Sequence, residues 1–437
     1  MPAASHKQFL FWLLCTALCG FALAGGFVLL VDPYGQYHLL QREGINAIKP
    51  SPERYQYELK LVNARRLAPS VLLVGNSRVE VGMNPDNAAL GGNAYNLGLA
   101  GTGAVTAISQ LNALNAQGIR PKRVIIGLEF MDALMLPGET PGVPLKLPAE
   151  KLGLTWRFDT LFSLTSLKDA MLTLFIQHDG EAGTQTERGF NPLHEYERFA
   201  RVDGYHKIFR QRAEENVLIA LRKAPGDLDV AGTRAEIAAM LDAATRRNPG
   251  VDIYLLIYPY HAQLMALIEE TGLGPHFDAW KDIVTDEVAL AARRHRETSM
   301  ALYDFSGYGF FNCEAIPAAG THDATRWYWE AGHFKQALGE LVVQRMLAPA
   351  QMPSGLDAEE QTAWRDFGQP LTTGTLAANR LRIANERKAC AERNPDTFSS
   401  VGQLVAQARA KAGALASKGQ QRKGAATAQV ITYASGQ

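Results

Sequence analysis

A short apolar run that ends in a small polar triplet places the strongest constraint on the fold of this chain. The run, 71–74, has the sequence Val-Leu-Leu-Val, and Gly75-Asn76-Ser77 follows it directly. Two leucines between two valines are typical of a strand that is buried on both faces of a parallel sheet. Such a strand releases the chain at the carboxyl edge of the sheet, where open α/β folds bind their ligands. An ordinary turn is the alternative, because Gly, Asn and Ser are all common in turns.

Further strand and helix patterns alternate along the chain. Strand-like runs lie at 93–97, 124–128, 253–257 and 301–304. Helical patterns lie at 53–66, 104–116, 237–244 and 276–296. This alternation predicts a parallel sheet with helices on both faces. The predicted fold class is therefore α/β, a three-layer α/β/α sandwich around a mostly parallel five-stranded sheet.

The N-terminal run 9–31 carries no charged side chain over 23 positions. A helix needs about 20 apolar residues to cross a bilayer, so this run is long enough. His6 and Lys7 precede it and Asp32 follows it, which favours a cytoplasmic N-terminus with the rest of the chain outside. The alternative is a cleavable signal peptide, for which Ala-Leu-Ala at 22–24 resembles a cleavage site. Because cleavage there would leave an apolar end, we predict an uncleaved single-pass anchor, 1–31.

The rest of the chain divides into two parts. Residues 32–348 hold all five predicted strands and form the main domain. An insertion at 136–215 interrupts the alternation with a Pro- and Gly-rich stretch and then an aromatic, amphipathic one. It either covers the carboxyl edge of the sheet, as lids do, or is a plain helical elaboration. We predict that 349–437 is a helical extension that ends in a disordered tail, 418–437.

Composition argues against some functional classes. The chain has 44 basic and 44 acidic side chains and no net charge, so nucleic acid is not a predicted partner. The four cysteines include no Cys-x-x-Cys pair, and we predict neither a metal nor a cofactor. Cys313 and Cys390 are the two cysteines outside the apolar run. Export predicts a disulfide between them, and two buried thiols are the alternative.

Three short motifs occur in the order of the SGNH (GDSL-like) hydrolase superfamily. Gly75-Asn76-Ser77-Arg78 resembles the nucleophile block, and 96–101 (Asn-Leu-Gly-Leu-Ala-Gly) resembles the second block. Glu330-Ala331-Gly332-His333 stands where the family carries Asp-x-x-His. The resemblance covers roughly 32–347 and is closest to the membrane-anchored, periplasmic branch, similar to alginate and teichoic-acid O-acylation proteins. It implies a flavodoxin-like SGNH sandwich with its main domain in the periplasm and its anchor in the inner (cytoplasmic) membrane.

The resemblance also implies a role for each residue. Ser77 is the implied nucleophile, His333 its base and Glu330 the carboxylate that orients the histidine. The backbone N–H groups of Ser77 and Gly101 form the implied oxyanion hole. At the start of a helix, residues three apart lie on one side, so Glu330 and His333 are expected to converge on Ser77. Structural alternatives are that Ser77 caps a turn, and that the other two merely open a helix.

Two departures from the family pattern stand out. After the third strand the family supplies an asparagine to the oxyanion hole, whereas this chain has Glu129. Glu330 also replaces aspartate. His322 is a competing histidine that we rank second to His333. We expect Arg78 to anchor its loop through hydrogen bonds and Glu129 to be structural.

The function that the resemblance implies is acyl-ester chemistry at the cell envelope. A serine nucleophile would transfer an acyl group, acetyl in the first instance, to a surface or secreted polysaccharide, or hydrolyse it from one. The implied partner is a membrane-bound O-acyltransferase. The competing hypothesis is an inactive polysaccharide-binding or scaffolding subunit of an acylation or export complex, which the missing asparagine favours.

Overall fold

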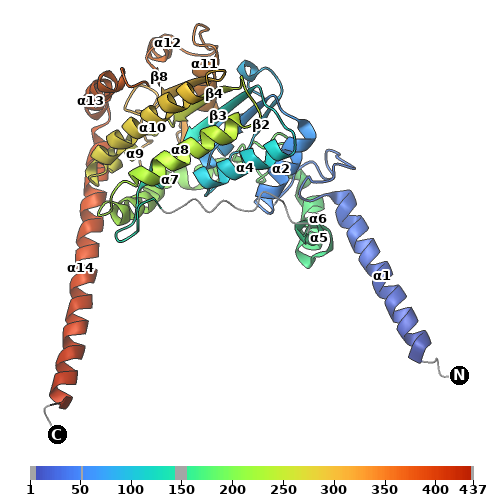
Figure 1. Ribbon diagram of the computed structural model, residues 1–437. Coiled ribbons are helices and arrows are strands. Elements are labelled where there is room, and N and C mark those ends of the chain that lie inside the picture. Colours follow the sequence, from blue (N-terminus) through green and yellow to red (C-terminus); the bar gives the residue numbers. More distant parts are fainter. Residues whose placement is uncertain (1–5, 51–52, 143–154, 435–437) are drawn as a thin grey trace.

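A mostly parallel sheet forms the centre of the computed structural model, which describes residues 6–50, 53–142 and 155–434 (Figure 1). Side chains are described up to residue 414. Part of the predicted insertion, 143–154, lies outside the described residues.

The sheet has six strands in the order β2-β1-β3-β4-β5-β8. They are β1 (Val71–Val74), β2 (Ala94–Asn96), β3 (Arg123–Leu128), β4 (Asp252–Ile257), β5 (Ser299–Asp304) and β8 (Gln369–Pro370). The first five pair in parallel, and β8 is antiparallel to β5. The prediction of an α/β fold with a mostly parallel sheet is therefore confirmed, but the prediction of five strands is wrong. The sixth strand escapes a sequence pattern because it is two residues long and contains a proline.

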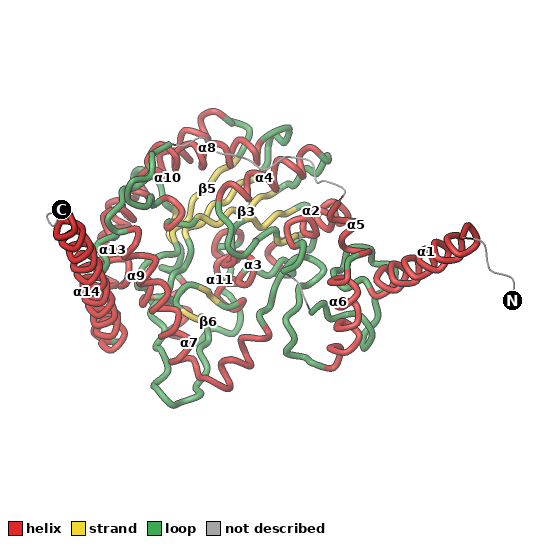
Figure 2. The backbone as a smooth tube through the Cα atoms, turned by 90° about the horizontal axis from the view of Figure 1, so that it is seen from below, coloured by secondary structure: helices red, strands yellow, loops and turns green. Residues whose placement is uncertain are grey.

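Helices lie against both faces of the sheet. Those beside it are α2 (Gln56–Leu67), α3 (Ser77–Gly82), α4 (Ala104–Ala116), α8 (Val230–Thr245), α10 (Gly274–Arg294) and α11 (Gln336–Leu347). Figure 2 shows α4, α8 and α10 along one face, with α3 and α11 on the other. Each face of the sheet is thus covered, which agrees with the apolar sequence of β1 and the apolar centres of β3 and β4.

The strand order reverses at β1, whose two neighbours are β2 and β3. Leu73 of β1 pairs with Asn96 of β2 and with Ile125 of β3. The four side chains of β1 are all at most 3% exposed. In open α/β sheets a crevice forms at such a reversal, outside the carboxyl ends of the strands. The residues that follow β1 therefore lie where sheets of this kind bind ligands.

The segment with Glu330 and His333 differs from the prediction that it opens a helix. It forms a small hairpin of β6 (Tyr328–Glu330) and β7 (His333–Phe334), and α11 begins only at Gln336. The aromatic residues at 327–329 favour a strand, and Ala-Gly at 331–332 makes a two-residue turn. In this hairpin Glu330 and His333 are paired across the strands. The two side chains are therefore neighbours, but for a different reason from the one predicted.

The N-terminal helix α1 (His6–Val31) is the one helix in the described part of the chain that is long and apolar enough to cross a membrane. Two helices of the insertion, α5 (Thr155–Phe162) and α6 (Leu164–Phe175), pack against its last turns.

The insertion then continues as α7 (His194–Lys223), which bends at Gly204 and lies against β6 and α9 (Ala262–Glu270). This helix extends beyond the predicted end of the insertion at 215. The insertion therefore has two parts, of which one supports α1 and the other lies beside the hairpin.

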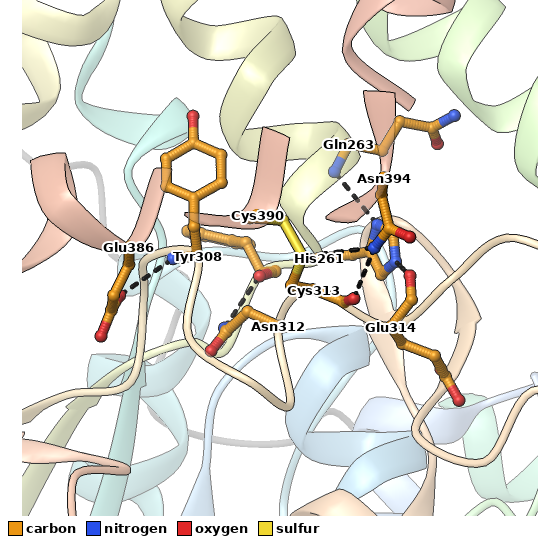
Figure 3. Close-up of a disulfide and its surroundings, with 10 residues drawn as sticks. His261, Gln263, Tyr308, Asn312, Cys313, Glu314, Glu386, Cys390 and Asn394 are labelled. Carbon is orange, nitrogen blue, oxygen red and sulfur yellow. Dashed lines mark hydrogen bonds between the residues drawn. A yellow bond between two sulfur atoms is a disulfide. The ribbon is translucent and has the colours of Figure 1, made fainter. Parts of the chain in front are cut away.

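The C-terminal segment is joined to the main sheet. It contains α12 (Ala358–Trp364), β8, α13 (Leu376–Arg393) and α14 (Pro395–Ala434), and α14 extends over most of the segment where we predicted disorder. A disulfide between Cys313 and Cys390 connects α13 with the loop after β5, with 5.9 Å between the two Cα atoms (Figure 3). Beside it the Asn394 side chain donates a hydrogen bond of 2.8 Å to the Cys313 carbonyl oxygen. The predicted disulfide is confirmed.

Replacing both disulfide cysteines, Cys313→Ser with Cys390→Ser, should lower the free energy of unfolding by about 2–5 kcal/mol. The reason is that the bond closes a long loop, with a sequence separation of 77 residues. Denaturant unfolding of the detergent-solubilised protein measures the change. The matched control is Cys15→Ser with Cys19→Ser, because these two cysteines are free and should leave stability unchanged. Four reactive thiols in the denatured, non-reduced wild type would contradict the prediction.

Candidate active site

Ser77 lies at the point where buried β1 turns into α3. Gly75 makes this turn possible, because a Cβ atom there would lie 2.7 Å from the hydroxyl oxygen of Tyr258. Asn76 caps the helix, and its side-chain oxygen accepts a hydrogen bond of 3.0 Å from the Arg78 N–H. Ser77 is then the first residue of α3. The strand, the glycine and the cap together hold the serine at the carboxyl edge of the sheet.

A chain of hydrogen bonds joins Ser77 to the β6–β7 hairpin. The Ser77 hydroxyl lies 2.7 Å from Nε2 of His333, and Nδ1 of the same ring is hydrogen-bonded to Glu330. A carboxylate can only accept, so Nδ1 carries the proton and Nε2 is free to accept from the serine. The structure thus brings together the three residues singled out in the sequence, although Ser77 and His333 are 256 positions apart.

Glu330 is kept in its charged form although it is 1% exposed. Burial alone would raise its pKa, but the adjacent His333, the Gly332 N–H at 2.8 Å and Arg212 together lower the pKa to about 2. Arg212 reaches in from α7, with its Nε 3.9 Å from a Glu330 carboxylate oxygen. A charged carboxylate at this position fixes the histidine tautomer and stabilises the imidazolium.

The side chain of Arg78, the residue after the serine, contacts the hairpin turn and Glu129. Its Nε donates a hydrogen bond of 2.7 Å to the Gly332 carbonyl oxygen, and its guanidinium is paired with Glu129. Glu129 also accepts from the Tyr260 hydroxyl at 3.1 Å. The prediction that Arg78 anchors its loop through hydrogen bonds is confirmed by these contacts, whereas Glu129 makes structural contacts and also lines the cleft beside Ser77.

The cleft beside Ser77 has a volume of about 580 Å³ and is lined by Gly101 and by α7 residues such as Asn216 and Lys223. In the described part of the chain, the backbone N–H groups of Ser77 and Gly101 have no protein acceptor. Both are therefore available to a negatively charged oxygen in the cleft.

The segment 96–101 contacts the helix that carries Ser77 and so supports this edge of the cleft. The Asn96 side chain donates hydrogen bonds of 2.7 and 2.8 Å to the carbonyl oxygens of Val79 and Met83, at the end of α3. Lys60 is fully buried and donates to the Gly98 carbonyl oxygen, and burial lowers its pKa to about 8. These contacts connect the glycine turn to the helix that carries Ser77.

The side-chain amide of Asn76 could take the place of the asparagine in the SGNH pattern as a donor, but it is already hydrogen-bonded within the protein. Asn76 lines the cleft, but its amide donates a hydrogen bond of 3.1 Å to Glu129. Burial, together with the charge of Glu129, raises the pKa of the neighbouring Asp132, which also lines the cleft. This side of the cleft therefore carries two carboxyl groups, Glu129 and Asp132, and the raised pKa favours the protonated form of Asp132, which can donate a hydrogen bond.

The structure separates the two candidate histidines. His322 is exposed and lines a second hollow with Tyr205, Trp329 and Lys335, whereas His333 contacts Ser77. Within 6–50, 53–142 and 155–434, no group of three or more His, Cys, Asp or Glu side chains is arranged to hold a metal ion.

Arg212 and Asp132 are site residues that the sequence analysis missed. Arg212 lies in the middle of a long charged helix, where nothing in the sequence distinguishes it from its exposed neighbours. Asp132 follows β3 closely, so its place after a strand was the one available signal.

Comparison of the sequence with protein-family models and with curated proteins found no match.

Titration of Glu330 should make a measurable contribution to stability. Because its pKa is lowered in the folded state, this contribution is present above its ordinary pKa and is lost as the pH falls towards about 2. At about 1.4 kcal/mol per pH unit, it amounts to about 3 kcal/mol. Between about pH 5 and pH 3, wild type should therefore lose more stability than Glu330→Gln.

Urea unfolding at several pH values measures this difference. Glu340→Gln, on the exposed side of α11, is the matched control and should follow wild type. Equal losses of stability in Glu330→Gln and wild type would show that Glu330 does not carry this charge.

Proposed function

We propose that this protein is a serine-dependent acyl-ester enzyme of SGNH type that acts on an O-acylated polysaccharide of the cell envelope. The observation that carries this proposal is the chain from Ser77 through His333 to the buried Glu330. It ends at a cleft of about 580 Å³ with two unpaired backbone donors.

In the first step, Nε2 of His333 takes the proton of Ser77 while the serine oxygen attacks the carbonyl carbon of an acyl ester. The charge that develops on the carbonyl oxygen is met by the N–H groups of Ser77 and Gly101. His333 then returns the proton to the leaving alcohol, and the acyl group stays on Ser77. A sugar hydroxyl or a water molecule accepts the acyl group in the second step, which completes transfer or hydrolysis.

Several observations support the SGNH-type assignment. The five parallel strands follow the order 2-1-3-4-5, which is the order of flavodoxin-like sheets, and Ser77 lies at the point where that order reverses. The three motifs occupy the carboxyl edge in the family's sequence order. The polysaccharide substrate and a membrane-bound O-acyltransferase partner come from the resemblance alone.

We also propose that α1 spans the inner membrane and that the α/β domain lies in the periplasm. The length and apolar character of α1 support the first statement. The disulfide supports the second, because disulfides persist in oxidising compartments.

One observation favours a second candidate, an inactive polysaccharide-binding or scaffolding subunit. Glu129 stands where the family has asparagine, and it also engages the amide of Asn76. Loss of one side-chain donor from an oxyanion hole costs about 100- to 1000-fold in rate. A slow enzyme and an inactive relative therefore have to be separated by experiment.

The test is release of acetate from an activated aryl ester by the full-length protein in detergent. Ser77→Ala and His333→Ala should each reduce the rate to the buffer background, and the double variant should be no worse than either. Glu330→Gln should be less severe, because the carboxylate orients the histidine without touching the substrate.

His322→Ala is the matched control and should retain wild-type activity, since this histidine is exposed and away from Ser77. Equal activity of Ser77→Ala and wild type, both on the ester and in restoring polysaccharide acylation to a deletion strain, would favour the scaffolding candidate.

A further inference from the structure

Helix α6 buries mostly polar side chains and exposes mostly apolar ones, the reverse of a helix in a water-soluble domain. Its buried side chains are Ser166, Asp169, Ala170 and Thr173, of which three are polar. Most of those that face outwards are large and apolar, namely Leu164, Met171, Leu172, Leu174 and Phe175, with the exposed Thr165 and Lys168 beside them. Leu164 and Phe175 are 85% and 80% exposed. A surface helix in water normally turns its apolar stripe to the core.

The polar side chains on the buried face of α6 form hydrogen bonds and an ion pair with the rest of the protein. Asp169 accepts a hydrogen bond of 2.8 Å from the Tyr34 hydroxyl and forms an ion pair of 2.8 Å with Arg54. Just beyond the end of α6, in the short 3-10 helix Ile176–His178, Gln177 exchanges two hydrogen bonds with the backbone of Ile48. The orientation of α6 is therefore determined by specific contacts, and its apolar face is left outside as a consequence.

The neighbouring helix α5 extends the same apolar surface. Phe158 is 63% exposed and Phe162 is 37% exposed. Phe162 also contacts α1, since a Cβ atom at Gly25 would lie 2.6 Å from its ring. Val28 and Val31 of α1 pack against Ala170 of α6. The exposed apolar surface of α5 and α6 is thus continuous with the end of α1.

The length of α1 determines how deep in a bilayer the exposed apolar surface of α5 and α6 would lie. The uncovered part of the apolar run of α1, 9–24, is only about 16 residues long, or about 24 Å at 1.5 Å per residue. The hydrocarbon core of a bilayer is about 30 Å thick, so a spanning α1 needs the next turn as well. That turn, from Gly25 to Val28, is the part covered by α5 and α6. If α1 spans the bilayer, α5 and α6 must reach the same depth.

We propose that α5 and α6 form a membrane-interface element that seats its apolar face in the acyl chains of the leaflet nearest the α/β domain. The surface that fits this description is that of a lipid bilayer, into which amphipathic helices sink by about 5–10 Å. The proposal rests on the membrane placement of α1 in the proposed function and is independent of the chemistry at Ser77. Its consequence is that the α/β domain is held at a defined height and tilt rather than on a flexible tether.

Nitroxide accessibility in vesicles tests this directly. The full-length protein, with Cys15→Ser and Cys19→Ser, carries one spin label at Leu164→Cys or Phe175→Cys. It is reconstituted in phosphatidylethanolamine–phosphatidylglycerol vesicles without other proteins. Oxygen collects in acyl chains and a nickel chelate stays in water, so the ratio of the two accessibilities reports lipid contact.

Two matched positions calibrate the measurement. Leu381→Cys lies on α13, is 64% exposed in wild type and should report water. Leu18→Cys on α1, 67% exposed in wild type, should report lipid. We expect the labels at 164 and 175 to give oxygen-to-nickel ratios several-fold above that at 381 and close to that at 18.

Three results would overturn the proposal. Ratios at 164 and 175 equal to that at 381 would place α5 and α6 in water, with the membrane placement of α1 unaffected. Labels closed to both reagents would indicate contact with a second copy of the chain instead of lipid. A water-like label at 18 would overturn this inference together with the membrane placement, whereas the ester assay would still decide the chemistry.

Discussion

The side chain of Arg78 joins three segments that lie far apart in the sequence. It follows β1 and the nucleophile candidate directly, it pairs with Glu129 at the end of β3, and it donates to the Gly332 carbonyl oxygen in the hairpin turn. Two tyrosine rings, of Tyr258 and Tyr260, lie 5.4 and 5.0 Å from its guanidinium carbon. Together with other contacts, such as the hydrogen bond of 2.9 Å from the Tyr328 hydroxyl to the Pro259 carbonyl oxygen, the contacts of Arg78 hold the hairpin, and with it His333, in register with Ser77.

This arrangement explains why a glutamate stands at 129. A buried guanidinium needs a charged partner, because an unpaired buried charge costs several kcal/mol. Glu129 supplies that partner, and it also receives hydrogen bonds from Asn76 and Tyr260. An asparagine at this position would donate to an oxyanion but would leave Arg78 uncompensated. Glu129 thus contributes an ion pair that helps to assemble this edge of the sheet.

The central sheet was predictable from the sequence because β1 is buried and apolar along its whole length and the other parallel strands contain short apolar runs between helical patterns. That Ser77, His333 and Glu330 lie together was predictable as well, since short motifs mark the carboxyl edge of the sheet, whereas their catalytic roles stay a prediction. The hairpin at 328–334 was mistaken for a helix start, because a three-residue spacing suits both structures. The strand β8 was missed because it is too short to leave a sequence pattern. Arg212 was missed because nothing in the sequence around it distinguishes it from its neighbours. The inverted polarity of α6 becomes visible only when the buried residues are known. The helical spacing of apolar residues in a sequence does not say which face of the helix is buried.

The most direct test of the central claim is whether Ser77 is an activated nucleophile. A fluorophosphonate probe reacts with serine hydroxyls that an adjacent base has activated, and peptide mass spectrometry then locates the modified residue. We expect stoichiometric modification of Ser77 in the wild-type protein, and strongly reduced modification in His333→Ala. A wild-type Ser77 that stays unmodified, or that reacts equally well in His333→Ala, would contradict the claim that His333 activates Ser77.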